Sequence, residues 1–385
     1  MSQDPATKSP NNISLVRGGR PFFDELIHLI EQARRYLQLM FYIFEEDNAG
    51  RMVLDALSRA ARRGVTVYLI VDGYGSKRFS ESRYRELRKA GVKFRSFAPI
   101  KGVRFSSIGR RMHTKAIVCD HKMAMVGGIN ISDKYLGDDN NTAWLDYAVK
   151  VSGPACERLH SLYELFWRRS FLNPKQIRNK EKIIREIMSE SDHTNWLVND
   201  RLRGFNLVSR SYFRAIYKSR KEIIILNSYF WPGIRFINEL RAAGDRGVRI
   251  KFILPAVSDS IIFRNASRYF YKVLFGIKNT EIYEWKQSVL HGKVALVDET
   301  WATVGSYNLN MLSALRSIEL NAVITDVSFI GSMRSELEQV MNASEKIDAD
   351  EFIKRTGYLG IFLNMVSYYL LHLSLLTLLF FSRKD

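Results

Sequence analysis

HTKAIVCDHKMAMVGGIN, at residues 113–130, has a close counterpart in HGKVALVDETWATVGSYN at residues 291–308. Both stretches fit one template: His, one residue, Lys, four residues, Asp, six residues, Gly with Gly or Ser, one residue, Asn. So many fixed positions are not expected to recur by accident in one chain. The repeat therefore predicts two similar units that each contribute one copy of the motif.

The similarity extends upstream of both motifs. Residues 37–72 and 223–255 each read as an apolar strand, a loop, an amphipathic helix and a second apolar strand. Strands that are apolar along their whole length are typical of a sheet covered by helices on both faces. Gly64 and Gly247 follow the two helices and suit their C-caps.

These patterns predict an α/β fold with two pseudosymmetric α/β/α domains. Each domain has a mixed sheet flanked by helices, and an apolar helix follows the second domain. The expected order is a disordered N-terminus at 1–12, a first domain at 13–172, a charged linker at 173–194, a second domain at 195–345, and a membrane-associated helix at 346–385.

The C-terminal segment 357–382 contains no charged residue. As a helix it would extend ~39 Å at about 1.5 Å per residue, which exceeds a hydrocarbon core of roughly 30 Å. Asn364, Ser367 and Ser374 fall on one side of that helix, which fits packing against protein or partial burial in the membrane interface. We expect membrane insertion or anchoring, with a buried core helix as the alternative.

The net charge of +18 indicates a polyanionic partner, either nucleic acid or an anionic membrane surface. Residues 261–285 interleave aromatic and basic side chains, which suits phospholipid headgroups or single-stranded nucleic acid. A packed cover is the alternative for that segment. The N-terminus has no apolar signal-peptide core, so we expect the protein on the cytoplasmic side of a membrane.

The motif residues suit chemistry at phosphorus. Alternate side chains of a strand share a face, so His113 and Lys115 are expected to point the same way, as are His291 and Lys293. Facing units would surround one phosphodiester with both pairs. One histidine attacks phosphorus, the other protonates the leaving oxygen, and the lysines stabilise the transition state. This chemistry requires no metal, and no cofactor is expected.

The remaining polar positions of the motif have secondary roles. Asp120 and Asp298 have the opposite strand parity, so we assign them a supporting role in which they hold neighbouring backbone or a basic side chain. The glycine-containing turns let backbone approach closely and would present Asn130 and Asn308 to an oxygen of the bound group.

Each half also carries an acidic residue at a similar distance downstream of its motif. These are Asp146 in AWLDYAVKV and Glu319 in RSIELNAVI. Carboxylates orient the imidazole in other catalytic triads, and an unpaired carboxylate in an apolar strand would be costly. We therefore predict that both acids orient histidines, with ordinary strand-edge acids as the alternative.

The template resembles the HxKxxxxD signature of the phospholipase D superfamily. FYIFEEDNAG, RRMHTKAIVCD, SYFWPG and ASRYFYKVL resemble bacterial cardiolipin synthases of the short form, which lack N-terminal transmembrane helices. The resemblance covers nearly all of residues 13–345. It implies phosphatidyl transfer to phosphatidylglycerol through a phosphohistidine intermediate, forming cardiolipin. It also implies His113 as nucleophile and His291 as general acid and base.

Other functions remain open from the sequence. A hydrolase of the same superfamily would use water in place of the lipid hydroxyl. A nucleic-acid phosphodiesterase would suit the charge but not the apolar C-terminus, and a non-catalytic lipid-binding scaffold would not need two intact motifs. The expected partners are an anionic phospholipid membrane and phosphatidylglycerol, without nucleic acid, at the cytoplasmic face of a bacterial inner membrane.

Overall fold

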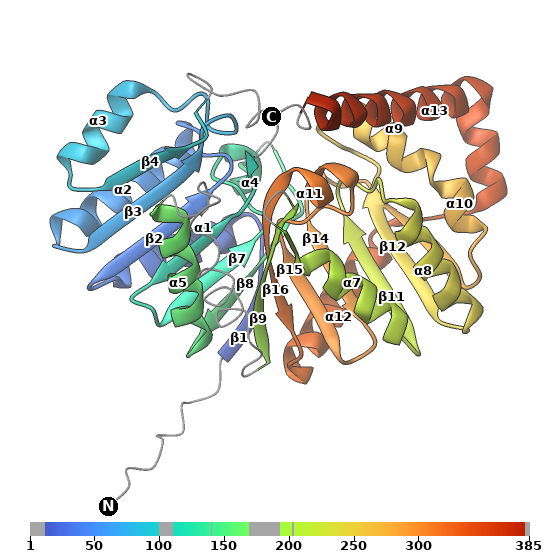
Figure 1. The fold of residues 1–385 in the computed structure, drawn as a ribbon, viewed down its shortest axis with the longest axis horizontal. Helices are drawn as coiled ribbons and strands as arrows, with labels where there is room; N and C mark the ends of the chain where they lie inside the picture. The colour runs from blue at the N-terminus through green and yellow to red at the C-terminus, as the bar shows by residue number, and fades with distance from the viewer. Residues whose placement is uncertain (1–11, 100–110, 140, 169–192, 202–203, 382–385) are drawn as a thin grey trace, which may run out of the picture.

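Two mixed β-sheets stand side by side in the computed structural model, with helices around and between them (Figure 1). The structure describes residues 12–99, 111–139, 141–168, 193–201 and 204–381. The predicted linker at 173–194 and the predicted disordered terminus at 1–12 lie almost entirely outside the described residues. The predicted domain limits therefore stay predictions.

The first sheet has seven strands in the order β1-β8-β7-β6-β2-β3-β4. Its β2, β3 and β4 run parallel, and the other neighbours pair antiparallel. The strands are β1 (Asn12–Arg17), β2 (Tyr36–Phe41), β3 (Thr66–Asp72), β4 (Lys93–Phe97), β6 (Ala116–Cys119), β7 (Met123–Gly127) and β8 (Tyr147–Ser152). The helices are α1 (Arg20–Gln32), α2 (Asn48–Arg62), α3 (Glu81–Lys89), α4 (Asp133–Leu136) and α5 (Ala155–Trp167).

The second sheet repeats this plan in the order β10-β9-β16-β15-β14-β11-β12-β13-β17. Its strands are β9 (Thr194–Asp200), β10 (Phe205–Asn206), β11 (Glu222–Asn227), β12 (Arg249–Pro255), β13 (Thr280–Trp285), β14 (Lys293–Val297), β15 (Trp301–Gly305), β16 (Ser317–Ile324) and β17 (Glu345–Ile347). Its helices are α7 (Leu207–Lys218), α8 (Ile234–Asp245), α9 (Ile261–Tyr269), α10 (Tyr271–Phe275), α11 (Met311–Leu315) and α12 (Val327–Asn342).

The predicted strand–helix–strand repeat appears as β2-α2-β3 in the first unit and β11-α8-β12 in the second. In α2 the apolar residues recur at helical spacing and bury one face, and Asp47 caps the helix by accepting from the Gly50 backbone N–H. Gly64 and Gly247 follow α2 and α8 with φ values of 91° and 88°. The left-handed conformation confirms both predicted C-caps.

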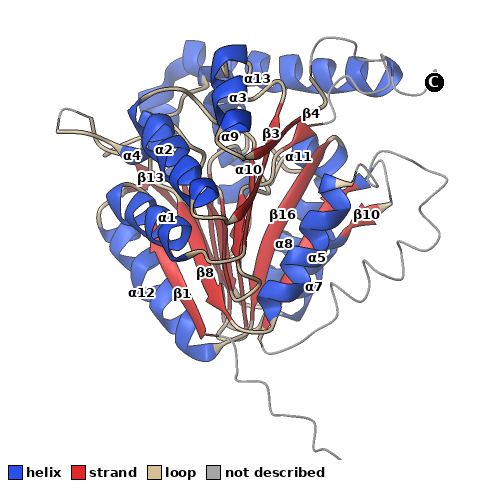
Figure 2. Cartoon of the chain, turned by 90° about the vertical axis from the view of Figure 1, so that its left-hand side faces the viewer, coloured by secondary structure: helices blue, strands red, loops and turns tan. Residues whose placement is uncertain are grey.

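The inner faces of the two sheets share one core, to which α5 and α12 also contribute. In the view of Figure 2 the strands run between helices on either side. The short strand β5 (Arg111–Met112) belongs to the first unit but pairs with β16 of the second. The predicted fold class is confirmed, and the shared core fixes the units against each other at the seam where both motifs lie.

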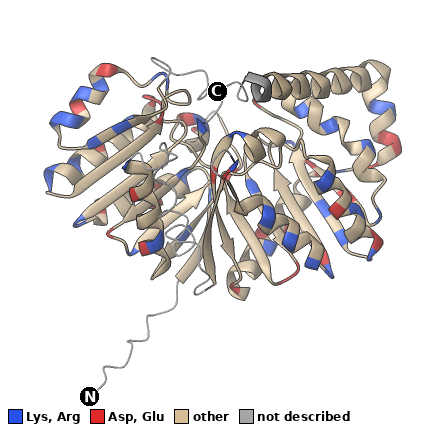
Figure 3. Ribbon diagram, viewed as in Figure 1, with Lys and Arg blue, Asp and Glu red and all other residues tan. Residues whose placement is uncertain are grey.

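The C-terminal helix α13 (Ala349–Phe381) runs across the top of the second unit in both ribbon views (Figures 1 and 2). It bends at Gly357, where φ is 61°. From Gly357 to Phe381 the helix carries no Lys, Arg, Asp or Glu (Figure 3). By length and composition alone, Ala349–Thr377 is the one helix among the described residues that would suffice to cross a membrane.

Candidate active site

Both histidine motifs meet at the seam between the two sheets. The backbone N–H of His113 donates to the carbonyl of Ile318, at 2.9 Å. The backbone N–H of His291 donates to the carbonyl of Leu145, at 2.8 Å. Each acceptor directly precedes one of the two predicted histidine-orienting acids, so backbone pairing brings each histidine beside the acid of the opposite unit.

The side chains complete this crosswise arrangement. Nδ1 of His113 lies 2.9 Å from Oε2 of Glu319, and Nδ1 of His291 lies 2.6 Å from Oδ2 of Asp146. The acids are fully buried. A carboxylate at Nδ1 holds the proton on that nitrogen, which leaves Nε2 as the reactive atom of each ring.

The turns after β7 and β15 are built around these acids. A Cβ atom at Gly128 would lie 2.4 Å from Oδ1 of Asp146, so only glycine fits there. At the equivalent place Ser306 donates its hydroxyl to Oε2 of Glu319, at 2.5 Å. The neighbouring carboxylate therefore accounts for both residues at this template position: Gly128 leaves room for Asp146, and Ser306 donates to Glu319.

The two motif lysines are buried beside their histidines. Lys115 Nζ donates to the carbonyl of His113 at 2.7 Å, and Lys293 Nζ likewise contacts the carbonyl of His291. The prediction that each pair lies within a strand is wrong, because His113 and Lys115 lie between β5 and β6, and His291 precedes β14. Pairing with the opposite unit occupies the backbone there, and the lysine folds back onto its own histidine.

Burial and like charges dominate the electrostatics of the site. Burial lowers the pKa of Lys115 to about 7 and that of Lys293 to about 8, against the pull of the buried acids. Burial and then the charge of Lys293 lower the pKa of His291 to about 4. Burial also lowers the pKa of His113 against the opposing pull of Glu319, and the charges of Lys115 and then Lys293 add to the lowering. Lys293 therefore acts on both histidines, and the buried cations favour a bound anion.

Asp120 and Asp298 lie away from the histidines and hold backbone. The carboxylate of Asp120 accepts from the N–H groups of residues 34–36, each at 2.8 Å. Asp298 accepts from residues 220–222 at 2.8–2.9 Å. Both aspartates adopt positive φ at the end of a strand. Each one therefore fixes the start of the neighbouring strand, β2 or β11, which agrees with a supporting role.

Replacing Asp120 with alanine is expected to lower the free energy of unfolding by about 2 kcal/mol, because backbone donors lose their acceptor and water replaces it only in part. Burial raises the pKa of Asp120, but the backbone donors outweigh it and hold the pKa below its usual range. The full loss of unfolding free energy in the variant is therefore expected above pH ~4. This difference from the wild type should shrink as the pH falls through the lowered pKa of Asp120 in the folded chain. Urea unfolding at several pH values measures it.

The control is Asp24→Ala, which removes an exposed ion pair with Arg20. Its expected cost is below about 0.5 kcal/mol at any pH. Equal losses in the two variants would mean that the carboxylate of Asp120 adds nothing beyond a surface charge.

The predicted phosphate-binding asparagines are engaged by protein groups. Asn130 accepts from the backbone N–H of Ile43 at 3.0 Å and donates to the Tyr135 hydroxyl at 2.8 Å. Asn308 accepts from the Ser228 hydroxyl at 3.0 Å. Both amides are buried and hold the loops around the histidines together, so direct contact with a phosphoryl oxygen is not what the structure shows.

Aromatic residues that the sequence interpretation missed surround the histidines. Tyr42 contacts His113 edge-on with ring centroids 4.7 Å apart. Tyr135, Trp144 and Tyr229 contact His291 at 5.2, 5.7 and 5.9 Å. Tyr135 and Trp144 follow the first motif closely in sequence, but only the packing of the units places them on the second histidine.

Tyr135 makes the two histidines unequal. Its hydroxyl lies 3.3 Å from Nε2 of His291 and is oriented by the amide donor of Asn130. The equivalent position in the second unit is Ser313, whose hydroxyl accepts a long contact of 3.5 Å from Asn308. Within the described residues no protein group hydrogen-bonds Nε2 of His113. Its side chain is 14% exposed, against 5% for His291.

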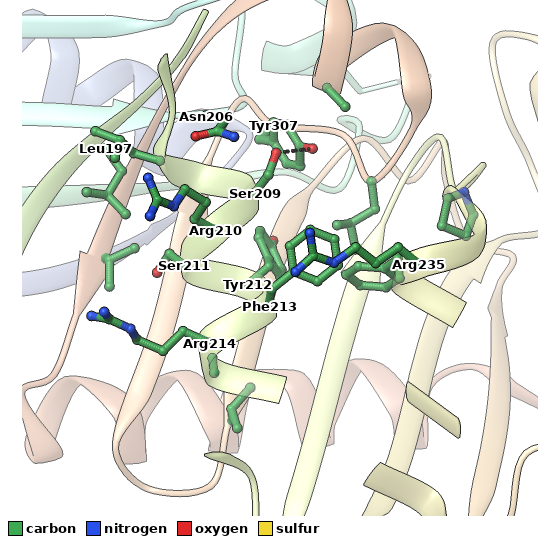
Figure 4. Close-up of a pocket in the computed structure, with 18 of the residues that line it drawn as sticks. Leu197, Asn206, Ser209, Arg210, Ser211, Tyr212, Phe213, Arg214, Arg235 and Tyr307 are labelled. Carbon is green, nitrogen blue, oxygen red and sulfur yellow. Dashed lines mark hydrogen bonds between the residues drawn. The ribbon is translucent and has the colours of Figure 1, made fainter. Parts of the chain in front are cut away.

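A separate groove of about 1250 Å³ lies beside α7 and α8 (Figure 4). It is lined by exposed cations, including Arg210, Arg214 and Arg235, and Arg235 lies over the Phe213 ring at 4.5 Å. Neither motif histidine nor motif lysine lines it. The reactive groups are at the seam, so we place the active site there and not in this groove.

Comparison with known proteins identifies the family. The family model described as "Cardiolipin synthase, PLD-like domain" matches residues 26–163 and 212–341. The chain belongs to this family. It is 34% identical to cardiolipin synthase B of Escherichia coli strain K12 over 363 residues, covering 90% of this chain and 85% of that protein. It is 28% identical to a probable cardiolipin synthase of Bacillus subtilis, covering 91% and 69%.

The fold comparison agrees with this membership. The crystal structure of phosphatidylserine synthase from Haemophilus influenzae superposes with a TM-score of 0.67 at 15% identity, covering 87% of each chain. At that identity the likeness concerns the fold. With the family shown, the predicted enzyme class is confirmed: the chain is a phosphatidyltransferase of the phospholipase D superfamily.

Proposed function

We propose that this enzyme forms cardiolipin from phosphatidylglycerol and a second phospholipid, through a phosphohistidine on His113. The observation that carries the proposal is the crosswise pairing of His113 with Glu319 and of His291 with Asp146. It places two buried imidazoles at one seam, with Nε2 of each ring free or open to proton exchange. The names of the relatives supply the product, cardiolipin, and the resemblance to bacterial cardiolipin synthases implies phosphatidylglycerol as substrate.

In the first step Nε2 of His113 attacks the phosphorus of the donor phospholipid. An N–P bond forms as the bond between phosphorus and the headgroup oxygen breaks, and His291 gives that oxygen a proton. Glu319 stabilises the positive charge that develops on the attacking ring. Lys115 and Lys293 neutralise the charge gathering on the phosphoryl oxygens.

In the second step a hydroxyl of phosphatidylglycerol takes the place of the departed alcohol. His291, now neutral, removes the proton of that hydroxyl, an O–P bond forms and the N–P bond breaks. The products are cardiolipin and free His113. The bound phosphodiester adds a negative charge beside the buried lysines and histidines. This charge favours protonated lysines and a protonated His291 when the substrate is present.

The surroundings of the two rings support His113 as the nucleophile. An attacking nitrogen needs an open lone pair, and the side chain of His113 is the more exposed of the two. Nε2 of His291 is covered by the hydroxyl of Tyr135, which suits a group that exchanges protons with an oxygen. The phosphohistidine is thus proposed on the first motif.

Hydrolysis is the second candidate, because water would attack the same intermediate. The aromatic cover of His291 favours transfer, since it reduces access of water to that ring. The proposed partners are an anionic bilayer and phosphatidylglycerol, at the cytoplasmic face of a bacterial inner membrane.

The test is product analysis with the purified full-length chain and vesicles of phosphatidylglycerol labelled in both glycerol groups. We expect labelled cardiolipin and free glycerol in equal amounts. Phosphatidic acid in place of cardiolipin would establish a hydrolase instead. Release of label from single-stranded DNA but not from vesicles would support a nucleic-acid phosphodiesterase.

A further inference from the structure

The long arm of α13 beyond Gly357 has two different faces. Its protein-facing side buries Asn364 and Ser367, which are 6% and 8% exposed. Its other side is mainly apolar and open to solvent, although His372, Ser374 and Thr377 of this arm are also exposed. The exposed residues there are Tyr358, Leu359, Ile361, Phe362, Leu363, Tyr369, Leu370, Leu373 and Leu376. A helix that spans a bilayer alone would expose both faces to lipid, so the buried polar stripe points to another placement.

Aromatic contacts hold the polar side of α13 against the second unit. Tyr368 stacks on Tyr269 of α9 with centroids 4.5 Å apart and an interplanar angle of 19°. Trp231 contacts both Tyr368 and His372 at 6.5 Å. The backbone N–H of Trp231 donates to Leu309, the residue after the motif asparagine, so α13 rests on the loop that frames the active site.

The short arm before the bend is anchored separately. Phe352 is buried and packs on Tyr271 with ring centroids 5.0 Å apart. Arg355 pairs with Glu345 at 2.8 Å. Because Gly357 adopts a positive φ, the chain turns there and the long arm runs along the surface. Both ends of the bend are therefore fixed to the domain.

The apolar surface continues toward the catalytic centre. Ile261 and Ile262 begin α9 and are 65% and 46% exposed. Two residues before Ile261, Asp259 accepts a hydrogen bond of 2.6 Å from Tyr229, whose ring contacts His291. A lipid surface on α13 and the start of α9 would thus lie two side-chain contacts from a reactive histidine.

We infer that the long arm of α13 lies in the plane of an anionic phospholipid bilayer, with its apolar face in the lipid and its polar stripe on the protein. In this placement the helix holds the active site against the membrane surface that contains the lipid substrate. The identity of this partner rests on the proposed function. The uncharged apolar face and the net charge of +18 fit acyl chains and anionic headgroups together.

Depth measurement in vesicles tests this placement without turnover. Leu359 and Leu373 lie on the outer face, about 21 Å apart at about 1.5 Å per residue. Single-cysteine variants at each position carry a fluorophore, and lipids with quenchers at different depths locate it. The native Cys119 and Cys156 are buried, and burial raises the pKa of both thiols to about 12, so they resist labelling.

We expect equal, shallow depths for Leu359→Cys and Leu373→Cys in vesicles of phosphatidylglycerol and phosphatidylcholine. A spanning helix would instead separate the two depths by most of their spacing, and a helix covered by protein would show no quenching. Either result overturns the inference. Val327→Cys, which is exposed at the start of α12, is the control and should remain unquenched.

A charged pair on the outer face tests the link to activity. Phe362→Glu with Leu370→Glu should lower vesicle binding and transfer in vesicles at least tenfold, while transfer with short-chain lipids dispersed as monomers stays unchanged. Val327→Glu should change neither rate. If the wild-type chain produces no cardiolipin but the depths are equal, the proposed function fails and the in-plane placement stands.

Discussion

Replacement of His113 with alanine is expected to lower the rate of phosphatidyl transfer by about 10⁴-fold or more, because the variant lacks the nitrogen that is proposed to attack phosphorus. The covalent lipid adduct should vanish as well. Each protein is mixed with labelled lipid, and turnover is stopped in acid-free denaturant. The wild-type protein should carry the label, and the variant should carry none.

The matched control is His28→Ala. His28 is an exposed histidine of α1 that belongs to neither motif. This variant should retain full activity and full labelling. If His113→Ala still forms the adduct while His291→Ala does not, the order of the two histidines is reversed. If both variants keep substantial activity, the shared pocket is not where the chemistry occurs.

The second large effect is expected from the crosswise acids. Glu319→Gln and Asp146→Asn each keep the shape of the side chain but remove the charge that holds Nδ1–H, which exposes the wrong tautomer to the substrate. An equivalent change in a Ser-His-Asp triad costs about 10⁴-fold, and we expect a loss of about 10³-fold or more here.

The two variants should differ in which step they slow. Glu319→Gln acts on His113 in the opposite unit, so the burst of headgroup release that reports adduct formation should slow. Asp146→Asn acts on His291 and should also slow breakdown of a preformed adduct by phosphatidylglycerol. Rapid-quench kinetics separate these steps, with the exposed Glu299→Gln as control. A normal burst in Glu319→Gln would contradict the crosswise assignment.

Local patterns in the sequence were sufficient for much of the architecture. Apolar runs and glycine positions predicted the repeated strand–helix–strand units, because these depend on residues close in sequence. Asp120 is predicted to lie away from its histidine, and the structure places its carboxylate on backbone. Strand parity is not the reason, because neither His113 nor Asp120 lies within a strand. The prediction that His113 lies in a strand was wrong, because its backbone N–H pairs with Ile318 of the other unit.

The sequence by itself determined that two like units carry two histidines, two lysines and two nearby acids. Only the tertiary structure decided that Glu319 serves His113 across 206 residues and that Asp146 serves His291. It also decided that Tyr135 covers one ring and that α13 buries Asn364 and Ser367 of its polar stripe but leaves Ser374 exposed. Periodicity reports which face a side chain occupies on its own element, whereas the packing of the two sheets selects which faces meet.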